Sequence, residues 1–277
     1  MKKHLSIPIA ALCTLALHVP ALADQLADIK ARGSLDCGVL DVFEPFGFTD
    51  PASRSVAGYD VDICHALARR LGVKAQIRPV SIEARIPSLQ QGHMDLLAAG
   101  LAHTPLRAQQ VDFSLGYYVS ENVLAVRSSR PYAATADLAG RRVSYVKGSI
   151  SENYLKTELP TATPVGYEEV PTAFTALVQG KVEAVSTSEE VLRRLFHKLG
   201  PKGSQYKVLQ PAIGQEVWGL GLRKGEGSLL QAVNQALRAM EAEGEMQAIF
   251  DKWLGSATLY GMQRRFRVGP VDMPAGS

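Results

Sequence analysis

The sequence predicts an α/β protein made of two similar lobes joined by two extended segments. Apolar runs of strand length alternate with segments of helical period along most of the chain, which is typical of mostly parallel sheets covered by helices. Residues 89–98 and 177–186 repeat one pattern of helix end, glycine, acidic turn and apolar strand. Two β-rich runs, at residues 117–127 and 216–222, interrupt the alternation and would connect the lobes.

Helices and strands are assigned by apolar spacing and by their end signals. Apolar residues at helical spacing before Gly72 predict a helix over residues 60–71, and Thr104 followed by Pro105 predicts the start of another helix. Further helices are expected at residues 83–91, 149–158, 170–179, 189–199 and 228–253, the last broken near Gly244. Strands are expected at residues 34–40, 75–80, 94–99, 142–146, 163–166 and 182–187.

The first 23 residues have the pattern of a secretory signal peptide. Lys2 and Lys3 precede an uncharged, mostly apolar stretch, and small residues at positions 21 and 23 precede Asp24. The apolar core is shorter than the roughly 20 residues that span a bilayer, so a membrane anchor is the weaker interpretation. We expect cleavage after Ala23 and a mature chain in the periplasm.

The predicted elements divide the mature chain into two lobes. Residues 24–120 would form the first part of lobe one, residues 121–217 lobe two, and residues 218–277 a return to lobe one with C-terminal helices and a tail. Ligands of α/β lobes bind outside the carboxyl ends of the strands. These positions are Gly100 in the first lobe and Ser188 in the second.

Charge and cysteine content restrict the partners. Loss of Lys2 and Lys3 lowers the formal net charge from +3 to +1, which argues against a nucleic-acid partner. Cys37 and Cys64 would form a disulfide in an oxidising compartment, but we favour two buried thiols. No cysteine or histidine cluster has metal-ligand spacing, and the paired acids are adjacent and cannot face each other, so we expect no metal, no cofactor and no enzyme.

Several residues near the predicted strand ends are suited to binding a carboxylate. Arg107 lies in the first turn of a helix, where N–H groups attract anions and a guanidinium group can form two parallel hydrogen bonds. Arg85 has a similar position, although it can pair with an acidic neighbour instead. Phe43 follows the first strand and can form a wall of a pocket. Gly148 and Ser149 offer a second anion site before a helix of lobe two.

Motifs along the chain resemble the family-3 solute-binding proteins of amino-acid ABC transporters. They are residues 43–48 (FEPFGF), 58–62 (GYDVD), 85–92 (RIPSLQQG) and 104–114 (TPLRAQQVDFS). Residues 217–224 (VWGLGLRK) and 250–253 (FDKW) are most similar to the glutamate/aspartate branch. The resemblance covers nearly the whole mature chain.

The resemblance implies a two-lobed periplasmic-binding-protein type II fold with two hinge strands. It implies a monomer that binds a small molecule and docks on a membrane ABC permease. Arg107 corresponds to the arginine that holds the ligand α-carboxylate, and Phe43 to the aromatic residue that stacks on the ligand. Arg85 corresponds to a residue that helps hold a side-chain carboxylate in the glutamate/aspartate branch. Gly148 and Ser149 correspond to the loop of lobe two that closes on the ligand.

Three positions depart from the family pattern. Ser188 replaces the aspartate that usually binds the α-ammonium group, Ala102 replaces a hydroxyl near the α-carboxylate, and Leu40 replaces a further arginine of acidic-amino-acid binders. A buried ammonium group without a carboxylate is costly. Either Glu189 or Glu168 therefore substitutes, or the ligand has no α-ammonium group.

Other functions stay open on the same fold. Periplasmic cyclohexadienyl dehydratases resemble this family, but Val191 stands where such an enzyme would carry an acid. A ligand-sensing module would need a separate signalling partner. The changes at Ser188 and Ala102 are also compatible with a protein that has lost its ligand. We favour capture of an amino acid or a related small carboxylate for uptake by an ABC transporter.

Overall fold

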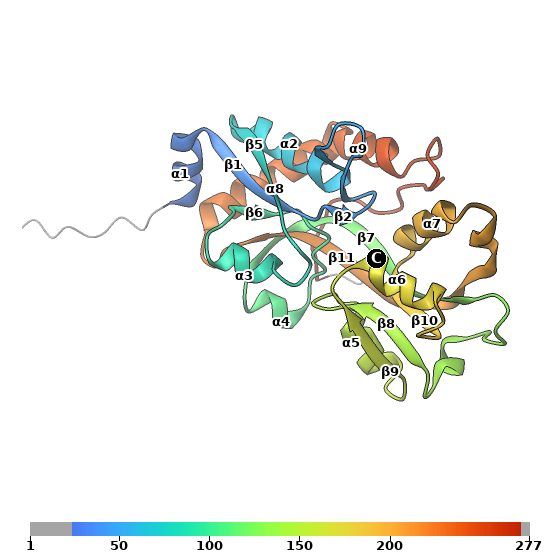
Figure 1. Ribbon diagram of the computed structural model, residues 1–277. Helices are drawn as coiled ribbons and strands as arrows, with labels where there is room; N and C mark the ends of the chain where they lie inside the picture. Colours follow the sequence, from blue (N-terminus) through green and yellow to red (C-terminus); the bar gives the residue numbers. More distant parts are fainter. Residues whose placement is uncertain (1–23, 273–277) are drawn as a thin grey trace, which may run out of the picture.

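The computed structural model describes residues 24–272 and contains a mixed eight-stranded sheet surrounded by helices. The predicted signal peptide lies outside the described residues. The strand order in the sheet is β5-β1-β6-β11-β7-β10-β8-β9 (Figure 1). The strands are β1 (Ser34–Val39), β5 (Lys74–Pro79), β6 (Leu96–Leu97), β7 (Asp112–Arg127), β8 (Arg142–Val146), β9 (Thr163–Tyr167), β10 (Ala184–Ser188) and β11 (Tyr206–Leu222).

The two long strands, β7 and β11, belong to both halves of the sheet. They pair with each other in antiparallel fashion, while β11 also pairs with β6 at Gly221 and Leu222, and β7 also pairs with β10 at residues 122–126. We call the part built on β5, β1 and β6 lobe one, and the part built on β10, β8 and β9 lobe two. The two predicted connecting segments are therefore present as hinge strands that run through the middle of the molecule (Figure 1).

The hinge strands are longer than the sequence pattern predicted. β11 begins at Tyr206 rather than at residue 216, and β7 at Asp112 rather than at residue 117. Pro211 lies within β11, where the pairing with β7 shifts register between Leu209 and Gly214. Because proline and a register shift interrupt regular alternation, the first half of β11 gives a poor strand signal in the sequence.

Lobe one contains six of the helices in residues 24–272. Helix α2 ends at Gly72, whose φ of +76° is the left-handed cap that the sequence predicted, and α4 begins with the Thr104 hydroxyl accepting a hydrogen bond from Arg107 N (3.1 Å). Helix α1 was not predicted. The helices are α1 (Gln25–Arg32), α2 (Tyr59–Leu71), α3 (Arg85–Gln90), α4 (Pro105–Ala108), α8 (Gly227–Ala242) and α9 (Glu245–Trp253).

Lobe two and the loop after β1 complete the fold. The helix expected over residues 149–158 starts two residues later, because Ser149 N first donates to Val146 O (3.1 Å) in a turn. No helix within residues 24–272 has the length and hydropathy needed to cross a bilayer. The remaining elements are α5 (Ser151–Glu158), α6 (Val170–Val178), α7 (Glu189–Lys198), two 3-10 turns, η1 (Thr135–Leu138) and η2 (Gly200–Gln205), and a small sheet of β2 (Val42–Phe43), β3 (Gly47–Thr49) and β4 (Val56–Ala57).

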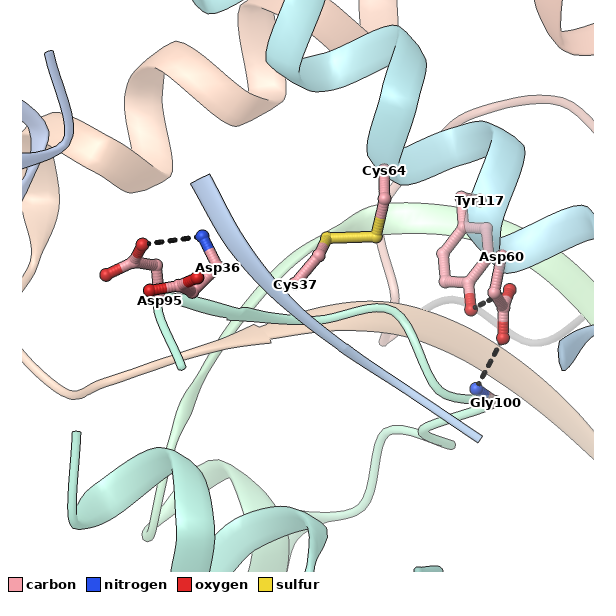
Figure 2. The surroundings of a disulfide bond; sticks show 7 residues. All are labelled: Asp36, Cys37, Asp60, Cys64, Asp95, Gly100 and Tyr117. Atoms are coloured by element: carbon pink, nitrogen blue, oxygen red, sulfur yellow. Dashed lines mark hydrogen bonds between the residues drawn. A yellow bond between two sulfur atoms is a disulfide. The ribbon is translucent and has the colours of Figure 1, made fainter. Parts of the chain in front are cut away.

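Cys37 and Cys64 form a disulfide, so the preference for two free thiols was wrong. The bond joins β1 to α2, two elements that lie next to each other in lobe one (Figure 2). The two Cα atoms are 6.3 Å apart, which is within disulfide range. The sequence pattern placed both residues on buried faces but did not predict that these faces meet.

We expect that replacing both Cys37 and Cys64 by alanine will lower the free energy of unfolding by about 3 kcal/mol. The bond closes a loop with a sequence separation of 27, and it restricts the unfolded chain more than the folded one. Urea denaturation of the oxidised protein and of the double variant measures the difference. Reduced wild-type protein is the matched control, and equal midpoints for all three samples would contradict the prediction.

Candidate functional site

A cavity lies between the two lobes, against the hinge strands. Its volume of about 40 Å³ is room for about three water molecules, so the lobes must separate for a larger molecule to enter. Its walls include Leu40, Phe43, Arg85, Gly100, Ala102 and Arg107 from lobe one, Asn122, Glu216 and Trp218 from the hinge strands, and Val146, Ser149, Ser151, Ser186 and Ser188 from lobe two.

Arg107 projects from α4 into this cavity with much of its hydrogen-bonding capacity unused. Its Nη1 donates to Ala102 O (2.9 Å) and its Nη2 to Gly148 O (2.8 Å), so it contacts both lobes. A guanidinium group has five N–H donors. Within residues 24–272, three of them are left for another partner. Burial lowers the pKa of Arg107, and the Glu216 carboxylate opposes this shift.

Arg85, at the start of α3, is largely occupied by main-chain carbonyl groups. Its Nε donates to Ile82 O (2.9 Å), and its Nη1 donates to Ala99 O (2.7 Å) and Gly100 O (3.0 Å). Its Nη2 donates to Gly148 O (3.3 Å) across the cavity. Burial and the nearby Arg107 charge lower the pKa of Arg85 to about 9. Arg85 therefore holds the loops of lobe one in place and has little capacity left for a ligand.

Asp60 on α2 positions the loop at Gly100, a residue that lines the cavity. Its carboxylate accepts hydrogen bonds from Gly100 N (3.1 Å) and from the Tyr117 hydroxyl (2.8 Å), and it is fully buried (Figure 2). Burial raises the pKa of Asp60 to about 7. The φ of residue 100 is +55°, a left-handed conformation that favours glycine at this position.

The hinge strands contribute two polar residues, Glu216 and Asn122, that were not expected from the sequence. Glu216 is 6% exposed, and its two carboxylate oxygens accept from Asn122 Nδ2 (3.0 Å) and Trp218 Nε1 (2.8 Å). Asn122 also donates to Ser151 Oγ and accepts from Ser186 Oγ, both at 2.8 Å. In the sequence, Glu216 could have been noticed as an acid in an otherwise apolar β-rich run. That pattern alone does not show which way the side chain points.

Lobe two presents hydroxyl groups whose hydrogen bonds are incomplete. Ser188 is 4% exposed, and its Oγ has no hydrogen-bond partner among residues 24–272. The buried Oγ of Ser149 is in the same situation. A buried hydroxyl group without a partner costs free energy, which a bound polar molecule would recover.

The structure brings the predicted site residues together. Seven of them line the cavity, and the eighth, Gly148, contributes its carbonyl oxygen. The two acids considered as substitutes for an aspartate at Ser188 do not line it, because Glu189 pairs with Arg193 and Glu168 with Lys147. No group of three or more His, Cys, Asp or Glu side chains suited to a metal occurs in the described part of the chain.

Glu190 ties lobe two to the first hinge strand. Its carboxylate, on α7, accepts from the Tyr118 hydroxyl (2.8 Å) and from Ser120 Oγ (3.1 Å), and it is 2% exposed. Burial raises the pKa of Glu190 from 4.5 to about 7, and the two hydrogen bonds oppose this shift only in part. Glu190 is therefore partly protonated near neutral pH.

An ion pair outside the cavity joins the two lobes. Glu44, in the loop between β2 and β3, lies 2.6 Å from Arg194 Nε on α7, and Lys198 Nζ is 3.9 Å from the same carboxylate. Both side chains of the closer pair are about one-fifth exposed. The pair is compatible only with closed lobes, because Glu44 belongs to lobe one and Arg194 to lobe two.

We expect stability to fall as the pH rises from about 4.5 through about 7, and Glu190→Gln to reduce this slope. A buried acid with a raised pKa binds more protons in the folded state than in the unfolded state, so its contribution is complete at low pH and is lost as pH rises through about 7. Asp60 acts in the same direction. Melting temperatures across this pH range test the prediction. Glu189→Gln is the control, and an unchanged slope in Glu190→Gln would refute it.

We expect Glu44→Gln to raise the ratio of open to closed forms of the ligand-free protein by about two- to fivefold. This is the effect expected from the loss of a partly exposed ion pair. Small-angle X-ray scattering at low ionic strength should show a larger radius of gyration than for the wild type. Glu152→Gln is the matched control, because its pair with Lys156 lies within α5 alone. Superimposable scattering curves for Glu44→Gln and wild type would exclude a role of this pair in closure.

Comparison with known proteins identifies the relatives of this two-lobed arrangement. The glutamine-binding protein GlnH of a Bacillus subtilis (strain 168) ABC transporter is 30% identical over 235 residues, 83% of this chain and 85% of that protein. The L-cystine-binding protein TcyJ of Escherichia coli (strain K12) is 28% identical over 244 residues, 87% of this chain and 90% of that protein. The crystal structure of the ancestral amino acid-binding protein AncCDT-1, a precursor of cyclohexadienyl dehydratase, is 31% identical with a TM-score of 0.76, and the match covers 83% of this chain and 100% of that one.

The match to a protein family extends across both lobes. The sequence profile of the bacterial extracellular solute-binding proteins, family 3, matches residues 35–256, which run from β1 to just beyond α9. The fold is the periplasmic-binding-protein type II fold with two hinge strands that the resemblance implied. The chain therefore belongs to the bacterial extracellular solute-binding proteins, family 3.

Proposed function

We propose that this protein captures an amino acid or a related small carboxylate in the periplasm and delivers it to a membrane ABC permease. The observation that supports the proposal is the unused hydrogen-bonding capacity of Arg107. Its guanidinium group is partly buried between the lobes, and within the described residues only two of its five N–H groups have protein partners. A carboxylate is the group that matches the remaining donors, because its two oxygens fit the guanidinium fork.

The proposed mechanism starts with the lobes apart. The ligand carboxylate binds Arg107 on lobe one, and rotation at the hinge strands then brings Gly148 and the Ser149 hydroxyl onto the ligand. Phe43 and Trp218, whose ring centroids are 5.9 Å apart, form the apolar wall on which the ligand packs. Closure removes water and strengthens each polar contact in the cavity.

The relatives support an amino-acid ligand. Proteins similar to this chain are named as binding glutamine, cystine and arginine. The narrower glutamate/aspartate specificity would require Arg85 to bind a second carboxylate. Four of its five N–H groups donate to carbonyl oxygens in the closed structure, so we place more weight on a ligand with one carboxylate.

An enzyme on the same fold is the second candidate. It is favoured by a buried acid, Glu216, in the cavity, and AncCDT-1, although itself an amino acid-binding protein, is named as the precursor of such an enzyme. It is opposed by Val191, an apolar residue where the resemblance would require a proton donor. Incubation of the purified protein with prephenate or arogenate, followed by product detection, distinguishes the two candidates.

A thermal-shift screen of the chain from Asp24 tests the proposal. The protein should first be unfolded and refolded to remove any carried ligand, and then screened against amino acids, dicarboxylates and keto acids. A ligand at 100 times its dissociation constant adds about 2.7 kcal/mol, which raises the melting temperature of a chain of this size by about 5–10 °C. No shift with any carboxylate would overturn the proposed function.

We expect Arg107→Ala to weaken binding of the best ligand by about 100-fold or more, since it removes one partner of a buried ionic contact. Arg107→Lys should recover only part of this loss, because lysine keeps the charge but not the two-pronged geometry. Isothermal titration calorimetry gives the affinities. Arg238→Lys, an exposed position on α8, is the matched control. Wild-type affinity in Arg107→Ala would show that the carboxylate binds elsewhere.

A further inference from the structure

The cavity contains two cationic side chains and one carboxylate. Arg85 is neutralised in part by four carbonyl dipoles, and Arg107 has free donors for a carboxylate. Glu216 is the acid, and it is almost completely buried. A charge in this position needs hydrogen bonds and a counter-charge to offset the loss of hydration.

Glu216 has hydrogen bonds but no ion-pair partner among the described residues. Trp218 Nε1 and Asn122 Nδ2 each donate to one of its oxygens. Neither donor carries a charge. Each carboxylate oxygen can accept a second hydrogen bond. Burial raises the pKa of Glu216, while these two donors and the arginine charges oppose the shift. A cation on the cavity side would complete both the hydrogen bonding and the charge balance.

The position of Glu216 relative to Ser188 identifies the part of the ligand that it would meet. Ser188 on β10 stands opposite Asn122 on β7, and the Asn122 amide bonds Glu216. Directly opposed residues in a ladder have Cβ atoms about 5 Å apart. Ser188 of lobe two and Glu216 of the second hinge strand are therefore both neighbours of Asn122, and both border the cavity.

We propose that Glu216 accepts the α-ammonium group of the ligand and makes the site selective for α-amino acids over acids without an amino group. This inference rests on the proposed function, because it assumes that Arg107 binds the carboxylate of the same ligand. An α-amino acid carries its two charges on adjacent groups, which suits a cavity that has Arg107 and Glu216 among its walls. Glu216 on the second hinge strand then takes the role of the aspartate that Ser188 replaces. Glu168 and Glu189 have no part in binding.

The test compares each amino acid with the acid in which hydrogen replaces the α-amino group. L-glutamine is paired with glutaramic acid, L-arginine with 5-guanidinopentanoic acid, and the other protein amino acids with their own deaminated forms. Titration calorimetry of the chain from Asp24 should show that the best amino acid binds about 100-fold more tightly than its deaminated partner. Glu216→Gln should remove most of this preference and leave binding of the deaminated acid within about threefold.

Control and rescue variants separate binding from folding. Glu168→Gln and Glu189→Gln should leave both affinities unchanged. Ser188→Asp in the Glu216→Gln protein returns an acid to the other side of Asn122, so it should recover at least tenfold in affinity for the amino acid. Melting curves establish that each variant is folded. If Glu216→Gln does not fold, Glu216→Asp is the alternative, because it moves the charge back by one methylene group. It should weaken binding of the amino acid more than binding of its deaminated partner.

The outcomes distinguish this inference from the proposed function. Equal binding of an amino acid and its deaminated partner by wild type, or full amino-acid affinity in Glu216→Gln, overturns the inference and leaves carboxylate capture intact. Absence of binding by any carboxylate overturns both. Selective loss of the amino acid in Glu216→Gln, with rescue by Ser188→Asp, supports the assignment of Glu216 as the residue that determines ligand class.

Discussion

The antiparallel pairing of β7 with β11 is the interaction on which the rest of the molecule depends. It extends from the pair Tyr206–Arg127 to the pair Leu222–Asp112, so one ladder is shared by both lobes. Because side chains alternate along a strand, every second residue points to the same face of the sheet, and near the middle of the ladder that face borders the cavity. Glu216 and Trp218 on β11 and Asn122 on β7 line the cavity there. β7 and β11 therefore have two roles. They connect the lobes, and they carry side chains that line the cavity.

Buried charges gather around this ladder, and most are held by neutral hydrogen-bonding groups. Arg85 donates to main-chain carbonyl groups, Asp60 accepts from Tyr117 and Gly100, and Glu190 accepts from Tyr118 and Ser120. Such groups stabilise a charge without cancelling it, which is why burial still raises the pKa of both carboxyl groups. The cavity itself is lined by Arg85, Arg107 and Glu216, so it favours a ligand that carries the opposite charges in the right places.

The closed arrangement depends on how near lobe two can approach lobe one. The Gly148 carbonyl accepts from both Arg85 and Arg107, and a Cβ atom at residue 148 would lie 3.0 Å from Glu83 Cα. A side chain at position 148 would therefore crowd the loop of lobe one at Glu83. The φ of +71° at Gly148 also favours glycine. The two lobes thus meet at a backbone contact beside the cavity, and the Glu44–Arg194 ion pair is a second contact between them.

Local signals in the sequence determined the fold class, the end of α2 at Gly72 and the start of α4 at Thr104, because caps and periodicity involve residues close together in the chain. They also placed Arg107 in a first helical turn after a strand, which is a local pattern, and the structure places this residue in the wall of the cavity. The Cys37–Cys64 bond, the burial of Glu216 and the occupation of Arg85 by carbonyl groups were decided only by the tertiary structure. Each of these features depends on which distant segments meet. In the sequence, Glu216 is only an acid within a β-rich run. Its burial results from the packing of β7 and lobe two around its side chain.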